Sequence, residues 1–235
     1  MATTSIAVEE TPRIRTLLTL ADDALILGHR LSEWTGHAPS LEEELALANI
    51  ALDLIGQARA LYQATGLPED DLAYLRDPHQ FRNASIAELP NGDFAFTIAR
   101  LFLVSVASDQ FWRNAVTNDD PDITAVAAKA EKETAYHVRH AAEWLVRLGD
   151  GTDESHRRAQ TAVNALWPYT GELTDRTDRA AWLRAVEPVL ARATLSHPED
   201  GWMQSGGRDG RHTEHLGHLL AEMQILPRTY PGATW

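Results

Sequence analysis

The sequence predicts an all-α protein: a bundle of long helices with additional helices toward the C-terminus. Apolar residues recur at steps of three and four over long segments, and capping residues or prolines stand where those segments begin. No alternating run bounded by turn pairs predicts a strand. A chain of 235 residues can bury a substantial core in one domain. We therefore expect a flexible N-terminal segment, 1–10, followed by a single helical domain, 11–235.

The first two helices are predicted as a hairpin. Thr11 and Pro12 combine a capping side chain with a proline at the first helical position, and the periodic segment that follows ends at Gly36. Ser40 and Glu43 have the spacing of a capping box, which predicts that a second helix starts here and runs to about residue 65. Two long helices joined by a short loop are typical of a bundle.

The rest of the chain continues the helical pattern after one interruption. Residues 67–92 contain prolines, acidic clusters and short apolar pieces, so we expect a long irregular connection with one short helix. The remaining helices are expected from Asp93 to about 117, from Pro121 to Gly149, near 153–170, near 178–195, and from about 213 to 226.

The composition excludes several classes of function. The net charge of −13 argues against nucleic acid as a partner, because binding to phosphates dominates that affinity. The absence of cysteine excludes disulfides and thiolate-bound metals, so a metal would need histidine and carboxylate ligands. No segment has the ~18 uncharged apolar residues of a membrane span, and the N-terminus lacks an export signal. We expect a soluble, cytoplasmic protein without membrane contact.

A metal centre of the di-iron carboxylate type would leave a specific pattern. Such bundles take one glutamate from each of two helices and a Glu-x-x-His pair from each of two others. This chain contains no Glu-x-x-His. The nearest forms, Asp153 to His156 and Asp209 to His212, lie near expected loops. The absence of such pairs from the core helices is the most informative feature of the sequence.

Two polar stripes interrupt the long helices instead. On the fourth helix one stripe beside the apolar face follows at steps of three or four, and Lys132 lies next to it. Its members are Lys129, Glu133, His137, His140 and Trp144. Glu133 and His137 have a spacing that could bind a metal, but a stripe whose members pair with one another is the favoured interpretation.

The second helix carries the other stripe. Its apolar residues lie on nearly all sides, which predicts burial on most sides, and only Asn49, Asp53 and Gln57 interrupt them. A buried Asp53 needs a partner. If the two stripes face each other, that partner is expected to be Lys132, Lys129 or an arginine.

Other carboxylates give weaker signals. Asp109 is the only mid-helix carboxylate of the third helix. Asp22 and Glu33 project away from the main apolar face of the first helix, so we expect both to be solvated. Taken together, the stripes predict the remains of a metal site, a polar network of these residues: Asn49, Asp53, Gln57, Asp109, Lys129, Lys132, Glu133 and His137.

A glycine-rich loop precedes the last helix. It carries Arg208, Arg211 and His212, which could contact an anion. The loop lacks the spacing of a phosphate-binding loop, so a flexible surface connection is favoured.

Five segments resemble, in order, the C-subunit family of phenylacetyl-CoA epoxidases: 31–62, 70–83, 89–100, 132–155 and 210–228. The resemblance implies a ferritin-like bundle that is the non-catalytic, structural partner of a homologous di-iron subunit. It implies no catalytic residue and no cofactor in this chain, with the di-iron centre in the catalytic partner. The complex would epoxidise the ring of phenylacetyl-CoA with oxygen and electrons from NADPH, in aerobic phenylacetate breakdown.

Two other interpretations remain open. The first is a stand-alone ferritin-like di-iron oxidase with irregular ligands drawn from Asp53, Asp109, Glu133 and His137. The second is a module that binds coenzyme A thioesters through Arg208, Arg211 and His212. Whether the chain also pairs with itself as a homodimer is not settled by the sequence.

Overall fold

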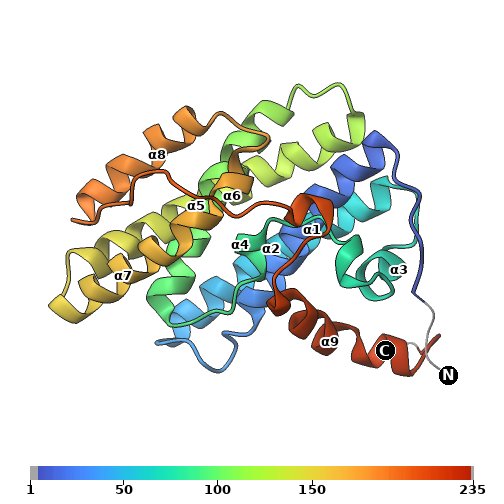
Figure 1. Ribbon diagram of the computed structural model, residues 1–235, viewed down its shortest axis with the longest axis horizontal. Helices are drawn as coiled ribbons and strands as arrows, with labels where there is room; N and C mark the ends of the chain where they lie inside the picture. Colours follow the sequence, from blue (N-terminus) through green and yellow to red (C-terminus); the bar gives the residue numbers. More distant parts are fainter. Residues whose placement is uncertain (1–4, 234–235) are drawn as a thin grey trace.

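The computed structural model describes residues 5–233, which form nine α-helices and four short 3-10 helices without any strand (Figure 1). The four longest helices are α1 (Pro12–Ser32), α2 (Leu41–Ala64), α5 (Phe94–Ala115) and α6 (Pro121–Gly149). They pair as two helical hairpins, α1 with α2 and α5 with α6, and α2 also packs against α6. The prediction of an all-α bundle of long helices is confirmed.

The starts of these helices follow the capping residues of the sequence, with one exception. Thr11 accepts a hydrogen bond from the Ile14 N–H at 3.2 Å, and Asp93 accepts one from Phe96 at 2.9 Å. The capping box predicted at Ser40 is wrong, because the Ser40 side chain makes no capping hydrogen bond. Glu43 is directed across the bundle instead, toward α6, and does not reach back to the helix start.

The connection between the two hairpins is more ordered than predicted. It contains two short α-helices, α3 (Glu69–Tyr74) and α4 (Ser85–Glu88), with the 3-10 turn η1 (Pro78–Gln80) between them. Its short apolar pieces anchor it, since Leu72, Phe81 and Ile86 are fully buried. This connection packs on α1 and α9, and so it covers a side of α1 that the helical projection alone assigned to solvent.

The C-terminal part adds further helices to the bundle. These are α7 (Asp153–Leu166), η2 (Trp167–Tyr169), η3 (Gly171–Thr174), α8 (Arg179–Arg192), η4 (Gly207–Asp209) and α9 (Glu214–Thr229). Helices α7 and α8 pack against α5 and α6, and α9 packs against α3 (Figure 1). Trp182 of α8 joins this layer to the core by donating a hydrogen bond to the Leu103 carbonyl of α5 at 3.1 Å.

Helix α5 is the central helix of the fold. It is long and apolar enough to cross a membrane by length and composition, but 72% of its most apolar window is buried inside the protein. Contacts with α6, α7 and α8 cover it. Its apolar composition is therefore explained by its place in the core.

The first ten residues were expected to be flexible. Residues 1–4 lie outside the described part, whereas 5–10 run along the protein surface. The Ile6 N–H donates to the Leu75 carbonyl at 3.1 Å, and Glu10 pairs with Arg82 at 2.5 Å. The described part of this segment is thus held against the connection and α1.

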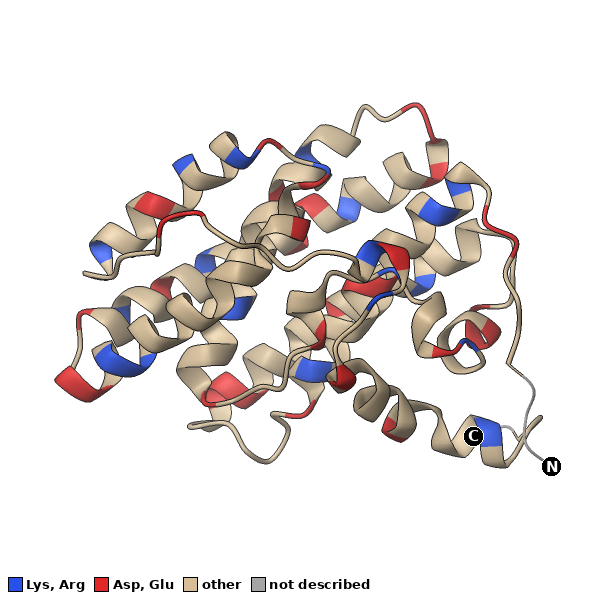
Figure 2. Ribbon diagram, viewed as in Figure 1, with Lys and Arg blue, Asp and Glu red and all other residues tan. Residues whose placement is uncertain are grey.

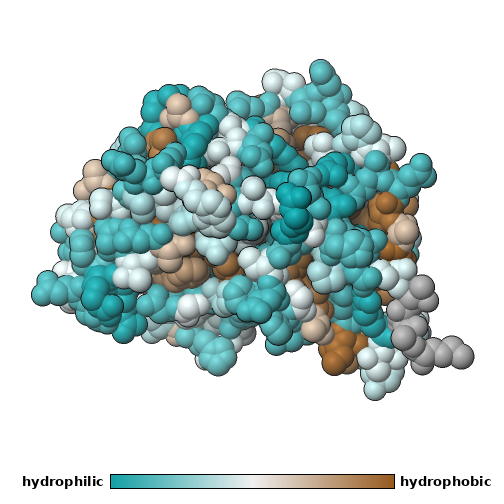
Figure 3. All heavy atoms as spheres, viewed as in Figure 1, coloured by the Kyte–Doolittle hydropathy of each residue, from teal (hydrophilic) through white to brown (hydrophobic). Residues whose placement is uncertain are grey.

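Helix α2 is less enclosed than its composition predicted. Three of its leucines are largely exposed, Leu41 at 68%, Leu45 at 57% and Leu52 at 66%. The prediction of burial on most sides is wrong, because the helix is covered where it faces α1, α6 and α3, whereas these leucines lie on an open side. The rest of the surface is of ordinary polarity: Figure 2 shows acidic and basic residues interspersed along the helices. In the same view, apolar residues form small separate groups on a mainly hydrophilic face (Figure 3).

Candidate functional site

The two polar stripes predicted from the sequence meet where α2 crosses α6. Asp53 Oδ2 lies 3.1 Å from His137 Nε2, and Gln57 donates a hydrogen bond to Glu133 at 2.9 Å. Lys129 pairs with the other oxygen of Glu133 at 2.7 Å. We call these five residues the α2–α6 seam. Every one of them comes from a regular helix, so the backbone fixes their register.

The partner of Asp53 differs from the prediction. Neither lysine nor any arginine forms an ion pair with it within the described residues, and His137 takes that place. Lys132 and Asn49 lie on exposed sides of their helices. Lys129 is held by Glu133, and that hydrogen bond raises the pKa of Lys129, with a smaller contribution from the charge of Asp53.

A further pair extends the seam: the sequence placed His140 in the stripe of the fourth helix, but its partner Glu43 was not predicted. Glu43 Oε2 and His140 Nε2 are 3.3 Å apart, and each side chain is only 11% exposed. Because α2 and α6 are antiparallel, residues that precede Asp53 on α2 lie opposite residues that follow His137 on α6. An antiparallel alignment of the two helices could therefore have predicted the pair from the sequence.

Burial governs the protonation of both histidines. It lowers the pKa of His137, although the hydrogen bond to Asp53 opposes the shift. It also lowers the pKa of His140, against the attraction of Glu43. Both imidazoles are therefore neutral at neutral pH, and His137 with its proton on Nε2 donates to Asp53.

The seam does not offer the donor set of a di-iron centre. Such a centre takes four carboxylates and two histidines that converge on the metals. Here Asp53 and His137 bond each other, and Glu133 is held by an amide and an ammonium group. Among residues 5–233, no three histidine or carboxylate side chains come together in a way that could hold a metal ion.

Asp109 is not part of the seam. It lies on α5 and pairs with Arg113 of the same helix at 3.0 Å. Burial raises the pKa of Asp109, although Arg113 opposes the shift. The four residues suggested as irregular metal ligands are thus divided between two places, because Asp109 is engaged on its own helix.

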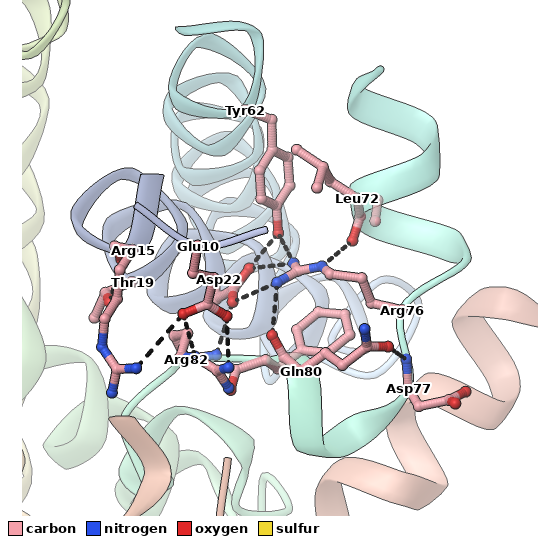
Figure 4. A network of polar contacts seen from close by, with 12 residues as sticks. Glu10, Arg15, Thr19, Asp22, Tyr62, Leu72, Arg76, Asp77, Gln80 and Arg82 are labelled. Carbon is pink, nitrogen blue, oxygen red and sulfur yellow. Dashed lines mark hydrogen bonds and ion pairs between the residues drawn. The ribbon is translucent and has the colours of Figure 1, made fainter. Parts of the chain in front are cut away.

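A second polar network lies inside the connection that covers α1 (Figure 4). Asp22 is fully buried, so the expectation that it is solvated is wrong. It pairs with the equally buried Arg76 at 2.5 Å and accepts hydrogen bonds from the Tyr62 hydroxyl at 2.5 Å and the Arg82 N–H at 2.7 Å. The helical projection failed here because the residues that cover Asp22 come from other segments, namely α2 and the flanks of η1. Glu33, by contrast, has a 41% exposed side chain, as expected.

The three residues suggested as an anion contact do not share one open surface. Arg208 pairs with Asp23 of α1 at 2.7 Å and donates to the Arg82 carbonyl at 3.0 Å. His212 lies between Glu88, at 2.8 Å, and the Phe81 carbonyl, at 3.0 Å. Burial lowers the pKa of His212, but Glu88 outweighs that effect and the net shift is upward. Arg211 alone is exposed.

The part of this loop that carries Gly207, Arg208 and His212 is therefore fixed by buried contacts and is not a flexible connection. We call residues 206–212 the strap. Its Gly207 N–H donates to the buried Glu172 at 2.7 Å, and Glu172 also accepts from Ser85 at 2.7 Å. Gly207 approaches the Asn83 carbonyl so closely that a β-carbon would lie 2.5 Å from it. The glycines allow this packing, which explains their frequency without a phosphate-binding role.

The comparisons with known proteins agree with one another. The model of a family described as "Phenylacetic acid catabolic protein" matches residues 1–235. The chain is 45% identical over 240 residues to the C subunit of 1,2-phenylacetyl-CoA epoxidase from Escherichia coli K12. That match covers 93% of this chain and 97% of the relative.

Proposed function

This chain belongs to the phenylacetic acid catabolic protein family, and we propose that it is the C subunit of a 1,2-phenylacetyl-CoA epoxidase. Within that complex it acts as a cytoplasmic, ferritin-like scaffold for a homologous di-iron subunit, which carries out the oxygen chemistry. Near full-length similarity to a protein of that name supports the assignment to the complex.

The α2–α6 seam, whose polar groups are bonded to one another, supports the proposal that this chain is not catalytic. Each of its carboxylates already holds a partner: Asp53 is bonded to His137, and Glu133 is bonded to Gln57 and Lys129. A group that already holds a partner in a protein interior binds a metal only after that partner is displaced. The seam therefore stabilises the crossing of α2 and α6. In the complex, this chain contributes by holding the surface to which the di-iron subunit binds.

The exposed leucines of α2 indicate where that partner docks. Leu41, Leu45 and Leu52 follow one another at steps of four and seven, which places them on one side of the helix. A row of largely exposed leucines is costly in water and is typical of a helix face that another protein covers. We therefore assign this row, the α2 leucine row, to the interface with the di-iron subunit.

Co-purification tests the docking assignment. The chain is expressed with the homologous di-iron subunit of the same organism, and the fraction recovered as a complex is measured by size-exclusion chromatography. We expect Leu45→Glu and Leu52→Glu to weaken association at least ~10-fold, because each buries a charge at the interface.

Ile225→Glu is the matched control, because Ile225 is 60% exposed but lies on α9, away from α2. All three variants should melt at the temperature of the unaltered chain. Full association of both leucine variants would contradict the docking assignment. A homodimer that the same two substitutions dissociate would mean that a second copy of this chain covers the row.

A further inference from the structure

A small, partly open cavity borders the seam, because Gln57 is one of its lining residues. It is lined mainly by apolar side chains of α1, α2 and α5, among them Ala24, Leu27, Leu54 and Val104. The turn after η3 closes it with Arg176, and the strap closes it with Arg208. Its volume is about 60 Å³. That is room for about four waters or a molecule of similar size.

Arg176 is the unusual member of this wall. In the described part of the chain its guanidinium makes no hydrogen bond and no ion pair, and its Nη1 is enclosed without a partner. Arg208, in contrast, is bonded to Asp23 through both carboxylate oxygens at 2.7 Å. The N–H groups of an arginine normally find an acceptor where they are enclosed by protein.

The nearby carboxylates do not supply that acceptor. Asp23 is held by Arg208 and also accepts from the Ala84 N–H at 2.7 Å. Asp175 influences Arg176 through its charge but is exposed to solvent and forms no ion pair with it. Burial, followed by repulsion from Arg208, lowers the pKa of Arg176 to about 10, so the guanidinium is still charged at neutral pH.

The cavity wall therefore combines one net positive charge with an apolar surface. The two arginines and Asp23 are its charged residues. Guanidinium groups match carboxylates because two parallel N–H groups meet two oxygens. The apolar wall favours a ligand whose remaining atoms are hydrocarbon, and the small volume of the cavity favours a short alkyl part.

We propose that this cavity binds a small monocarboxylate of the acetate or propionate type, with its carboxylate on Arg176 and its alkyl end against Leu27 and Val104. The proposal concerns this chain alone and does not depend on its role in the epoxidase. The acetate proposal can therefore be wrong while the docking assignment is correct, and the docking assignment can be wrong while the acetate proposal is correct.

Thermal unfolding of the full chain with sodium acetate is the test, at constant ionic strength set with sodium chloride. We expect acetate to raise the melting temperature in a saturable way, whereas acetamide, which lacks the charge, does not. Arg176→Met should lose this rise completely. Arg176→Lys, which keeps the charge but not the planar fork, should need a higher acetate concentration for the same rise.

Arg192→Gln is the control, because Arg192 is exposed on α8, and it should respond to acetate like the unaltered chain. Without acetate, Arg176→Met should melt no lower than the unaltered chain, since it removes an enclosed cation without a partner. An equal rise with and without the Arg176 guanidinium, or no saturable rise, would overturn the proposal. A larger Arg176-dependent rise with inorganic phosphate would also overturn it, because the ligand class would then be wrong.

Discussion

Asp22 and Arg76 illustrate how single residues decide the fold of this protein. Both side chains are fully buried, and the arginine lies 4.1 Å from the centre of the Phe81 ring. The pair links α1 to the connection that the sequence presents as irregular. Its position could not be predicted from the helical projection, because Arg76 is 54 positions away from Asp22 along the chain.

Removing one partner of this pair should be far more damaging than removing an exposed charge. Asp22→Ala leaves Arg76 buried without its carboxylate, and we expect a loss of about 3–5 kcal/mol in the free energy of unfolding. Chemical denaturation followed by circular dichroism measures it. Glu154→Gln, which breaks an exposed pair with Arg157, is the control and should leave unfolding almost unchanged. An Asp22→Ala variant as stable as the control would show that the network contributes little.

At the scale of helices, the α2–α6 seam shows what periodicity can and cannot predict. Steps of four placed Lys129, Glu133 and His137 in one stripe, and a polar interruption marked Asp53 and Gln57 in the other. The pairing between the stripes depends on the rotation of two helices, which periodicity does not give. As a result His137 took the place expected for a lysine.

The seam is also less buried than a fully enclosed ion pair. The side chain of Asp53 is 33% exposed, and that of Lys129 is 75% exposed. The cost of 3–5 kcal/mol that applies to a fully buried pair is therefore too large here, and about 1–2 kcal/mol is expected for Asp53→Ala. The seam fixes the crossing of two helices but does not dominate the stability of the bundle.

Acid should weaken the seam. The pKa of His137 is lowered in the folded protein below its usual value of 6.5. The unfolded chain therefore binds the proton more readily, so the stability from a neutral His137 is present above pH 6.5 and is lost as the pH falls below it. His140 has the same direction of shift and adds to the effect, while Asp53 and Glu133 limit it.

Melting temperatures between pH 7.5 and about pH 5.5 measure this contribution. We expect the fall in melting temperature to be smaller for His137→Gln than for the unaltered chain, since glutamine can donate to Asp53 but does not titrate. Parallel curves for the two proteins would mean that the proton is taken up elsewhere.

At the scale of the whole molecule, the positions of the long helices could be predicted from the sequence. The segments and surfaces around these helices could not. Capping residues and apolar steps predicted α1, α5 and α6 to within a few residues. The exposed row on α2 was not predicted, because apolar composition alone does not distinguish a core face from an interface. The strap and the connection were not predicted either, since their order depends on buried polar contacts between distant segments.

We propose that this member of the family is a scaffold whose α2–α6 seam is closed by hydrogen bonds and an ion pair between its own side chains. Iron per chain, measured by elemental analysis of the protein purified alone from iron-replete cells, tests it most directly. We expect a value near zero, because Asp53, Glu133 and His137 already hold partners. About two irons per chain, as in a di-iron bundle, would contradict it, and the seam residues would then have to exchange their partners for metal.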